Sequence, residues 1–390
     1  MAEVPGFGNF FEYFIKDLSK LASSSALFDT KSLALQFLKI AIEKYKDLEN
    51  NDFSIKAEVD EILKVITRYL QSEWDFSFEK DPGTYLKLLG RRDFAYNTLN
   101  NLEPIFMELN ETLKQIKFNE FKEADSETIQ EAIKQLTQVA QPMVISAELG
   151  AIIAELCQEN LGYFDVPLPL VKPNNLGIVL PNVSRLADEF NTDIREVLFS
   201  VVSSELLLSV ILGSSVRQDY LSVLVKEYIA EFKDLTFDFQ NLGGQSLDTL
   251  MNEPLSIDQL GLQKSSGQLI ASAEIKRLLS VSYGFRDYFL SVLKQRFIGG
   301  SIDVIEHLVK REVELSTGRR ALIELFDINL DDEIRNKGRN FIKEIAEKEG
   351  PSALKALIYL PSGFPTESEF EDIEKWIQRI RINSGESSLF

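Results

Sequence analysis

VLFSVVSSELLLSVILGSSV, residues 197–216, is an apolar run with a single charged side chain, Glu205, near its middle. On a period of 3.6 residues, Glu205 shares one broad face with five aliphatic side chains, those of Leu198, Val201, Val202, Leu208 and Leu212. The pattern predicts a helix that Asn191 or Thr192 caps and Gly213 ends.

This run is long enough to cross a membrane, but its composition argues against that. Six of its residues are serines, and a carboxylate at the centre of a bilayer would cost several kcal/mol. The flanks carry charged residues and no aromatic belt. We therefore expect a helix buried inside a soluble protein, with a raised pKa for Glu205. A buried carboxyl must be protonated, hydrogen-bonded or paired, and Ser204 and Ser209 are candidate partners.

Charge and cysteine content narrow the class of protein. The 390 residues carry 42 Lys+Arg against 61 Asp+Glu, a net charge of −19 that repels nucleic acids and anionic lipids. Cys157 is alone, which excludes an intrachain disulfide and favours a buried thiol. The N-terminus has no cationic start before an apolar core, so we expect no secretory signal and a cytoplasmic location.

The rest of the chain predicts a mainly α (α+β) fold. Amphipathic segments indicate helices over residues 8–22, 30–48, 55–72, 93–118, 126–162, 216–233, 268–297, 301–316, 331–349 and 367–381. Prolines interrupt residues 164–186, where LGIVL reads as a short strand, and we expect a small hairpin or edge strand near 166–181. Residues 241–268, rich in Gly, Ser and Asn, are expected to be a connection or an active-site lid.

A short β-element before a helix with a central glutamate is the layout of zinc metallopeptidases. Their His-Glu-x-x-His motif places two zinc ligands on one helix face, beside a glutamate that acts as base towards the metal-bound water. The corresponding residues here are Ser204-Glu205-Leu206-Leu207-Leu208.

Several stretches of the sequence resemble one family in their order and spacing: PGFGNFFEYFIKDLSKL (5–21), NLGYFDVPLP (160–169), LGIVLPNV (176–183), SSVRQDYLSVLVKEYI (214–229), DINLDDEIRNKGRNFIKEIAEKEG (327–350) and LPSGFPTESEFEDIEKWIQRI (360–380). They are similar to the zincin-like zinc-dependent metalloproteases common in actinobacteria. The resemblance implies a helical N-terminal part (1–125), a zincin-like core (126–300) and a helical C-terminal part (301–390), packed as one unit.

The same resemblance implies a degenerate metal site. The family's first zinc histidine falls on Ser204, its glutamate on Glu205 and its second histidine on Leu208. The third ligand position falls on Tyr283, beside Gly284, and a nearby histidine position falls on Tyr288. A catalytic zinc wants three ligands of His, Cys or carboxylate type, so we expect zinc to be lost and no cofactor to take its place.

Other chemistries have little support in the sequence. The one histidine, His307, lies about a hundred residues from Glu205, and no nucleophile elbow or phosphate-binding loop is present. The stretch that begins DINLDDE is not a calcium loop, because Asp332 stands where the loop needs glycine and Gly338 where it needs its bidentate glutamate. Glu148 is a candidate second carboxylate for Glu205, although a Ser or Tyr hydrogen bond to each acid is the simpler expectation.

Two functions remain. The first is a catalytically inactive family member that binds a protein or peptide partner, such as an active relative, with Glu205 held by Ser or Tyr hydroxyls. The second is a hydrolase with a noncanonical metal or none, in which Glu205 is the general base and Tyr283 or Tyr288 the electrophile. A membrane-docking stripe at Phe10, Phe11 and Phe14 is disfavoured because its polar face has no cationic surplus. The sequence does not fix the oligomeric state.

Overall fold

The fold of this computed structural model is mainly helical. It describes residues 30–43, 53–113, 115, 117–118, 145–234, 236–237, 264–298, 308 and 316–383. The predicted helix over 8–22, most of the one over 301–316, His307, the stripe at Phe10 and most of the connection over 241–268 lie outside these residues. The predicted fold class is confirmed by the helices and by two very short parallel sheets.

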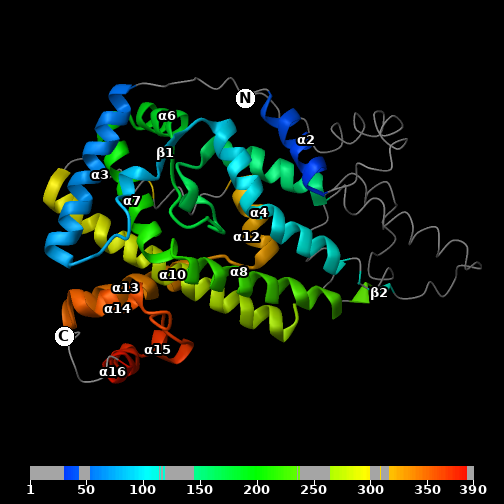
Figure 1. The fold of residues 1–390 in the computed structure, drawn as a ribbon. Coiled ribbons are helices and arrows are strands. Elements are labelled where there is room, and N and C mark those ends of the chain that lie inside the picture. Colours follow the sequence, from blue (N-terminus) through cyan, green and yellow to red (C-terminus); the bar gives the residue numbers. More distant parts are fainter. Residues whose placement is uncertain are drawn as a thin grey trace, which may run out of the picture.

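The first half of the described chain contains the β1–β3 sheet and the helices beside it (Figure 1). Its elements are α2 (Thr30–Ile42), α3 (Phe53–Trp74), β1 (Leu86–Leu89), α4 (Arg91–Leu113), β2 (Lys117–Phe118), a helix described over residues 145–159, the 3-10 turn η2 (Tyr163–Asp165), β3 (Leu176–Val179) and α6 (Leu180–Phe190).

The second half supplies the long helices and the C-terminal group. Its elements are α7 (Ile194–Leu212), α8 (Ser215–Ala230), η3 (Glu231–Asp234), β4 (Thr236–Phe237), α10 (Ser266–Leu293), a π-helical turn (Lys294–Ile298), α12 (Thr317–Phe326), α13 (Asp332–Lys348), α14 (Pro351–Tyr359), α15 (Glu367–Glu371) and α16 (Ile373–Asn383). Figure 1 shows α13 to α16 gathered on the α10 side of the molecule.

Of the two alternatives near 166–181, the edge strand is confirmed and the hairpin is not formed. β3 pairs in parallel with β1, in the register Leu86 to Leu176 and Leu89 to Val179. Residues 166–173 contain three prolines, which lack the N–H that a strand ladder needs. The antiparallel contact to β3 comes instead from just before these prolines, through a bridge between Gly162 and Ile178.

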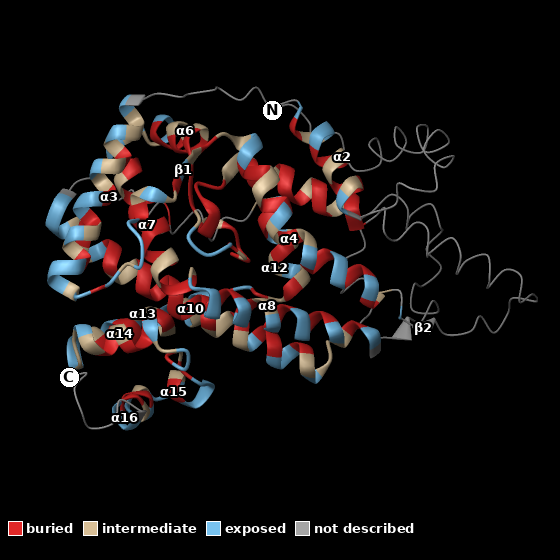
Figure 2. Ribbon diagram, in the orientation of Figure 1, coloured by how far each residue is buried: buried red, intermediate tan, exposed pale blue. Residues whose placement is uncertain are grey.

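α7 is the buried helix that the opening stretch predicts, and Figure 2 shows it red along much of its length. Asp193, rather than Asn191 or Thr192, is its N-cap, with a carboxylate that accepts a hydrogen bond from the Arg195 N–H. Asn191 instead ends α6 in the left-handed conformation, and Gly213 is the C-cap of α7 as predicted. α7 packs against α3, α6, α10, β3 and η2, which places its central residues in the core.

The boundaries of other helices depart from their predicted ranges where local signals intervene. The helix expected over 126–162 stops at residue 159, and the one expected over 367–381 is two helices separated at Asp372. α6, α12 and α14 were not predicted; each is 11 residues or shorter, so few apolar repeats mark it.

α10 and α13 cross at very short range because small residues line the crossing. A Cβ on Gly284 would overlap the backbone of Gly338, and one on Gly338 would overlap the backbone of Ser280. The Ser280 hydroxyl also donates to the Ile334 carbonyl oxygen at 2.5 Å. This crossing fixes the C-terminal helices against α10.

No single helix in the described part of the chain is long and apolar enough to cross a membrane. One bent combination reaches that length and composition, Ile194–Leu212 with Ser215–Lys233, but its axis turns by 79° at the break.

Candidate functional site around Glu205

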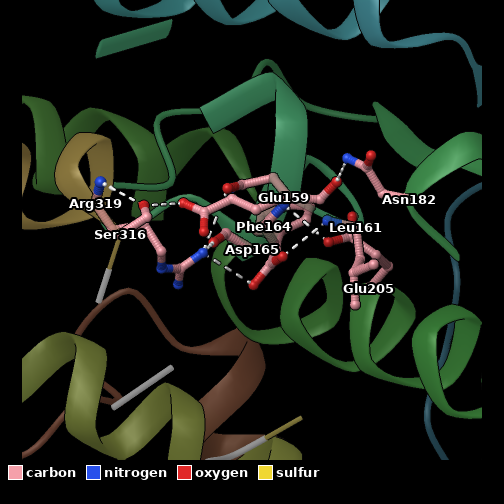
Figure 3. A network of polar contacts seen from close by, with 9 residues as sticks. Glu159, Leu161, Phe164, Asp165, Asn182, Glu205, Ser316 and Arg319 are labelled. Carbon is pink, nitrogen blue, oxygen red and sulfur yellow. Dashed lines mark hydrogen bonds and ion pairs between the residues drawn. The ribbon is translucent and has the colours of Figure 1, made fainter. Parts of the chain in front are cut away.

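Glu205 is an interior carboxyl, as predicted. It lies in the middle of α7 and is 2% exposed. Its Oε1 accepts a hydrogen bond of 3.0 Å from the backbone N–H of Phe164, drawn in Figure 3, whereas its Oε2 is buried without a hydrogen-bond partner. The carboxyl therefore faces the chain's own backbone and not solvent.

Gly162 is what allows the backbone to approach so closely. A Cβ at this position would overlap both the carboxyl of Glu205 and the carbonyl oxygen of Gly177. The φ of Gly162 is −167°, which any residue can adopt, so its glycine is required for space and not for conformation. Residues 160–165, which we call the capping segment, thus cover the Glu205 carboxyl.

The capping segment is held at its C-terminal end by an arginine. Arg319, from α12, donates to the backbone carbonyl of Asp165 at 2.7 Å and pairs with its carboxylate at 3.4 Å. The other oxygen of that carboxylate accepts from the Leu161 N–H at 2.8 Å, which closes the turn on itself. These contacts are drawn in Figure 3.

An asparagine on α6 holds the other end. The Asn182 amide donates to the carbonyl oxygens of Asn160, at 2.7 Å, and Cys157, at 3.1 Å. Its own oxygen accepts from Arg91 at 2.8 Å. Because both ends are anchored to separate helices, the capping segment has few ways to move away from Glu205.

This environment favours the protonated form of Glu205. Burial raises its pKa well above the ordinary value, and the nearby Asp165 carboxylate raises it further, while the backbone N–H groups of residues 163–165 oppose the change. Burial and the same glutamate raise the pKa of Tyr163 to about 12. A protonated carboxyl can donate a hydrogen bond, but it cannot accept a proton as a general base.

The structure assigns different partners from those we expected. The prediction that Ser or Tyr hydroxyls hold Glu205 is wrong, because the donor is the Phe164 backbone N–H. Ser209 donates to the Leu206 carbonyl oxygen instead, and Ser204 is half-buried. A serine on a helix readily bonds to the carbonyl three or four residues earlier, which removes it as a partner for a side chain.

The remaining predicted site residues are buried or occupied elsewhere. Leu208 is 1% exposed. Tyr283 is buried on α10, with the Arg286 guanidinium 5.0 Å from its ring centre. Tyr288 packs edge-on against Trp74, with ring centres 6.1 Å apart.

Burial raises the pKa of Glu148 as it raises that of Glu205, but the two carboxyls do not act on each other. Glu148 is half-buried on the helix over 145–159, and burial alone raises its pKa. The carboxylate that acts on Glu205 is Asp165, on the capping segment.

The residues at the positions where the resemblance places metal ligands do not fit zinc. Leu208 has no donor atom, and the hydroxyl of a serine and the phenol of a tyrosine are poor zinc ligands at neutral pH. Within the described ranges, no group of three or more His, Cys, Asp or Glu side chains could hold a metal ion. The backbone of Gly162 and Phe164 also lies directly against the Glu205 carboxyl.

The capping segment is the part of the site that sequence reasoning missed. Its contacts join residues 160–165 to Asn182, Glu205 and Arg319, which lie on three separate helices and share no periodicity with the segment. One signal was available, since NLGYFD breaks a helical pattern with a glycine and then an acid. That signal predicts a turn, but not which side chain the turn covers.

The comparisons with known proteins agree with this architecture. The chain is similar to a crystal structure of a candidate hydrolase with a novel fold from Chloroflexus aurantiacus, with 14% identity and a TM-score of 0.59 over 90% of this chain and 97% of that one. At that identity the likeness concerns the fold alone. The comparison with curated proteins found no significant match. The family model for zincin-like metallopeptidases matches residues 41–377, and the chain belongs to that family.

Proposed function

We propose that this protein is a non-catalytic member of the zincin-like metallopeptidase family and acts by binding a protein or peptide. The observation that carries the proposal is the covered carboxyl of Glu205, which is 2% exposed and bonded to the Phe164 backbone. A general base must reach the proton it removes, directly or through one water. The capping segment occupies that approach.

The loss of zinc is part of the same proposal. Ser204, Leu208 and Tyr283 stand where the family resemblance places metal ligands, and none of them is a good zinc ligand. We derive no catalytic step through a metal for this chain. The retained fold over residues 41–377 is then free to serve as a binding scaffold. The single cysteine agrees with a reducing compartment, and we place the protein in the cytoplasm.

A hydrolase assay with Glu205→Gln tests the proposal against its alternative. Wild type and variant are incubated with a library of unstructured peptides, and cleavage is followed by mass spectrometry. We expect no cleavage by either protein. Turnover that wild type shows and Glu205→Gln lacks would establish Glu205 as a general base and overturn the proposal. Glu108→Gln, an exposed change on α4, is the matched control.

A further inference from the structure

In the described part of the chain, α8 and α10 carry five large apolar side chains that are exposed to solvent. On α8, Val216, Tyr220 and Val223 are 49%, 40% and 49% exposed, and on α10, Leu269 and Ile270 are 51% and 66% exposed. We call these five residues the α8–α10 face. Isolated exposed aliphatic residues are common on soluble proteins, whereas a group along neighbouring helices indicates an interaction site.

Side-chain contacts show that α8 and α10 run antiparallel and bring Val223 and Ile270 to a similar level along the two helices. The Tyr220 hydroxyl donates to Glu274 at 3.2 Å, and near the other end of α8 the Ser265 hydroxyl donates to Glu231 at 2.7 Å. Val223 lies between these two contacts on α8, and Ile270 lies between them on α10. The two side chains therefore belong to one patch.

The spacing of the residues on α8 suits a helical partner. Val216, Tyr220 and Val223 are at positions i, i+4 and i+7, which form one stripe about 10 Å long on a helix. A partner helix with its own apolar residues at this spacing could pack along the α8–α10 face.

The charge of this surface distinguishes the partners that could bind to the α8–α10 face. Asp219 and Glu227 are exposed on α8, where Lys226 is the one exposed cation. The whole chain carries −19, which repels a second copy of itself and an anionic lipid surface, and attracts a basic partner. We propose that the α8–α10 face docks a basic amphipathic helix of a partner protein. This inference rests on the binding role proposed above and names the surface and the partner class for it.

A peptide titration tests this assignment. The probe is a synthetic helical peptide with leucines at i, i+4 and i+7 and lysines on its flanks, labelled for fluorescence anisotropy. We expect saturable binding by wild type and at least tenfold weaker binding by the double variant Val223→Ser, Ile270→Ser. The matched control, Val65→Ser with Ile382→Ser, removes two exposed aliphatic side chains from α3 and α16 and should bind like wild type. Circular dichroism confirms that all three proteins are folded.

Three outcomes of the peptide titration would overturn the surface assignment. They are no saturable binding of the lysine peptide, equal weakening by the two double variants, and equal binding of a peptide with glutamates in place of the lysines. Light scattering that shows a dimer in wild type and a monomer in Val223→Ser, Ile270→Ser would also overturn it, because a second copy would then be the occupant. None of these results bears on catalysis, whereas cleavage that depends on Glu205 would overturn the binding role itself.

Discussion

At the scale of single residues, the central feature is a buried carboxyl whose surroundings favour its protonated form. Glu205 shares its site with the backbone of the capping segment and with the like charge of Asp165. Its raised pKa has a consequence for stability, because the native state keeps a proton that the unfolded chain releases above a pH of about 4.3. The contribution of Glu205 to stability is thus fully present below that pH and is lost as the pH rises towards its native pKa.

Glu205→Gln should therefore change the pH dependence of unfolding. A glutamine is neutral at every pH and keeps an oxygen for the Phe164 N–H. We expect the two proteins to be similar in stability near pH 4 and the variant to gain on wild type by up to about 1.4 kcal/mol for each further pH unit, until Glu205 ionises in the native state. Urea unfolding between pH 4 and pH 9 measures this. A difference that is the same at all pH values would contradict a neutral Glu205.

Gly162→Ala should destabilise the protein through space alone. The new methyl group would overlap the Glu205 carboxyl and the Gly177 carbonyl oxygen, so we expect a loss of about 1–3 kcal/mol in the free energy of unfolding. Gly83→Ala is the control, because a Cβ there would meet only Asp81 at 3.4 Å or more. Equal effects of the two changes in urea titrations would refute the close approach.

The sequence indicated the burial of Glu205 but not its partner. An apolar stripe around a single acid requires an interior carboxyl, and this holds whatever packs against it. The choice between a hydroxyl and a backbone N–H depends on the tertiary path of residues 160–165. The spacing of apolar residues within α7 does not predict where residues 160–165 lie.

At the scale of elements, the sequence was informative where a pattern is long and local. α3, α4, α7, α10 and α13 each run for 17 residues or more and were predicted near their observed ranges. The partner of β3 was not predictable, because β1 lies about ninety residues earlier and the pairing is parallel. The cap of α7 was missed by one residue, since Asn191, Thr192 and Asp193 are all good capping residues.

Gly338→Ala tests the crossing of α10 and α13. A methyl group at this position would overlap the Ser280 carbonyl, which forces the two helices apart. We expect a loss of about 1–3 kcal/mol, together with faster hydrogen exchange in α13, α14 and α16 than in α7. Uniform acceleration across the protein would mean that the C-terminal helices do not separate from α10 as a group.

At the scale of the whole molecule, the family and the mainly helical fold agree. The residues at the positions where the resemblance places zinc ligands, however, are not good ligands for zinc. The family model covers residues 41–377, and the resemblance read from the sequence led to the same family. The division of the chain into residues 1–125, 126–300 and 301–390 stays a prediction. From the sequence, an inactive protein could be predicted only from the missing zinc ligands. The backbone that covers Glu205 could not be predicted, because it depends on contacts between distant segments.

The most direct test of the central claim is the metal content of the full-length protein. The protein is purified without chelator or metal-affinity resin, analysed by elemental mass spectrometry and then titrated with zinc. We predict far less than one zinc per chain and no saturable binding, because Leu208 offers no donor and the capping segment fills the space beside Glu205. Near-stoichiometric zinc that persists through dialysis would contradict the account and make peptidase assays the next experiment.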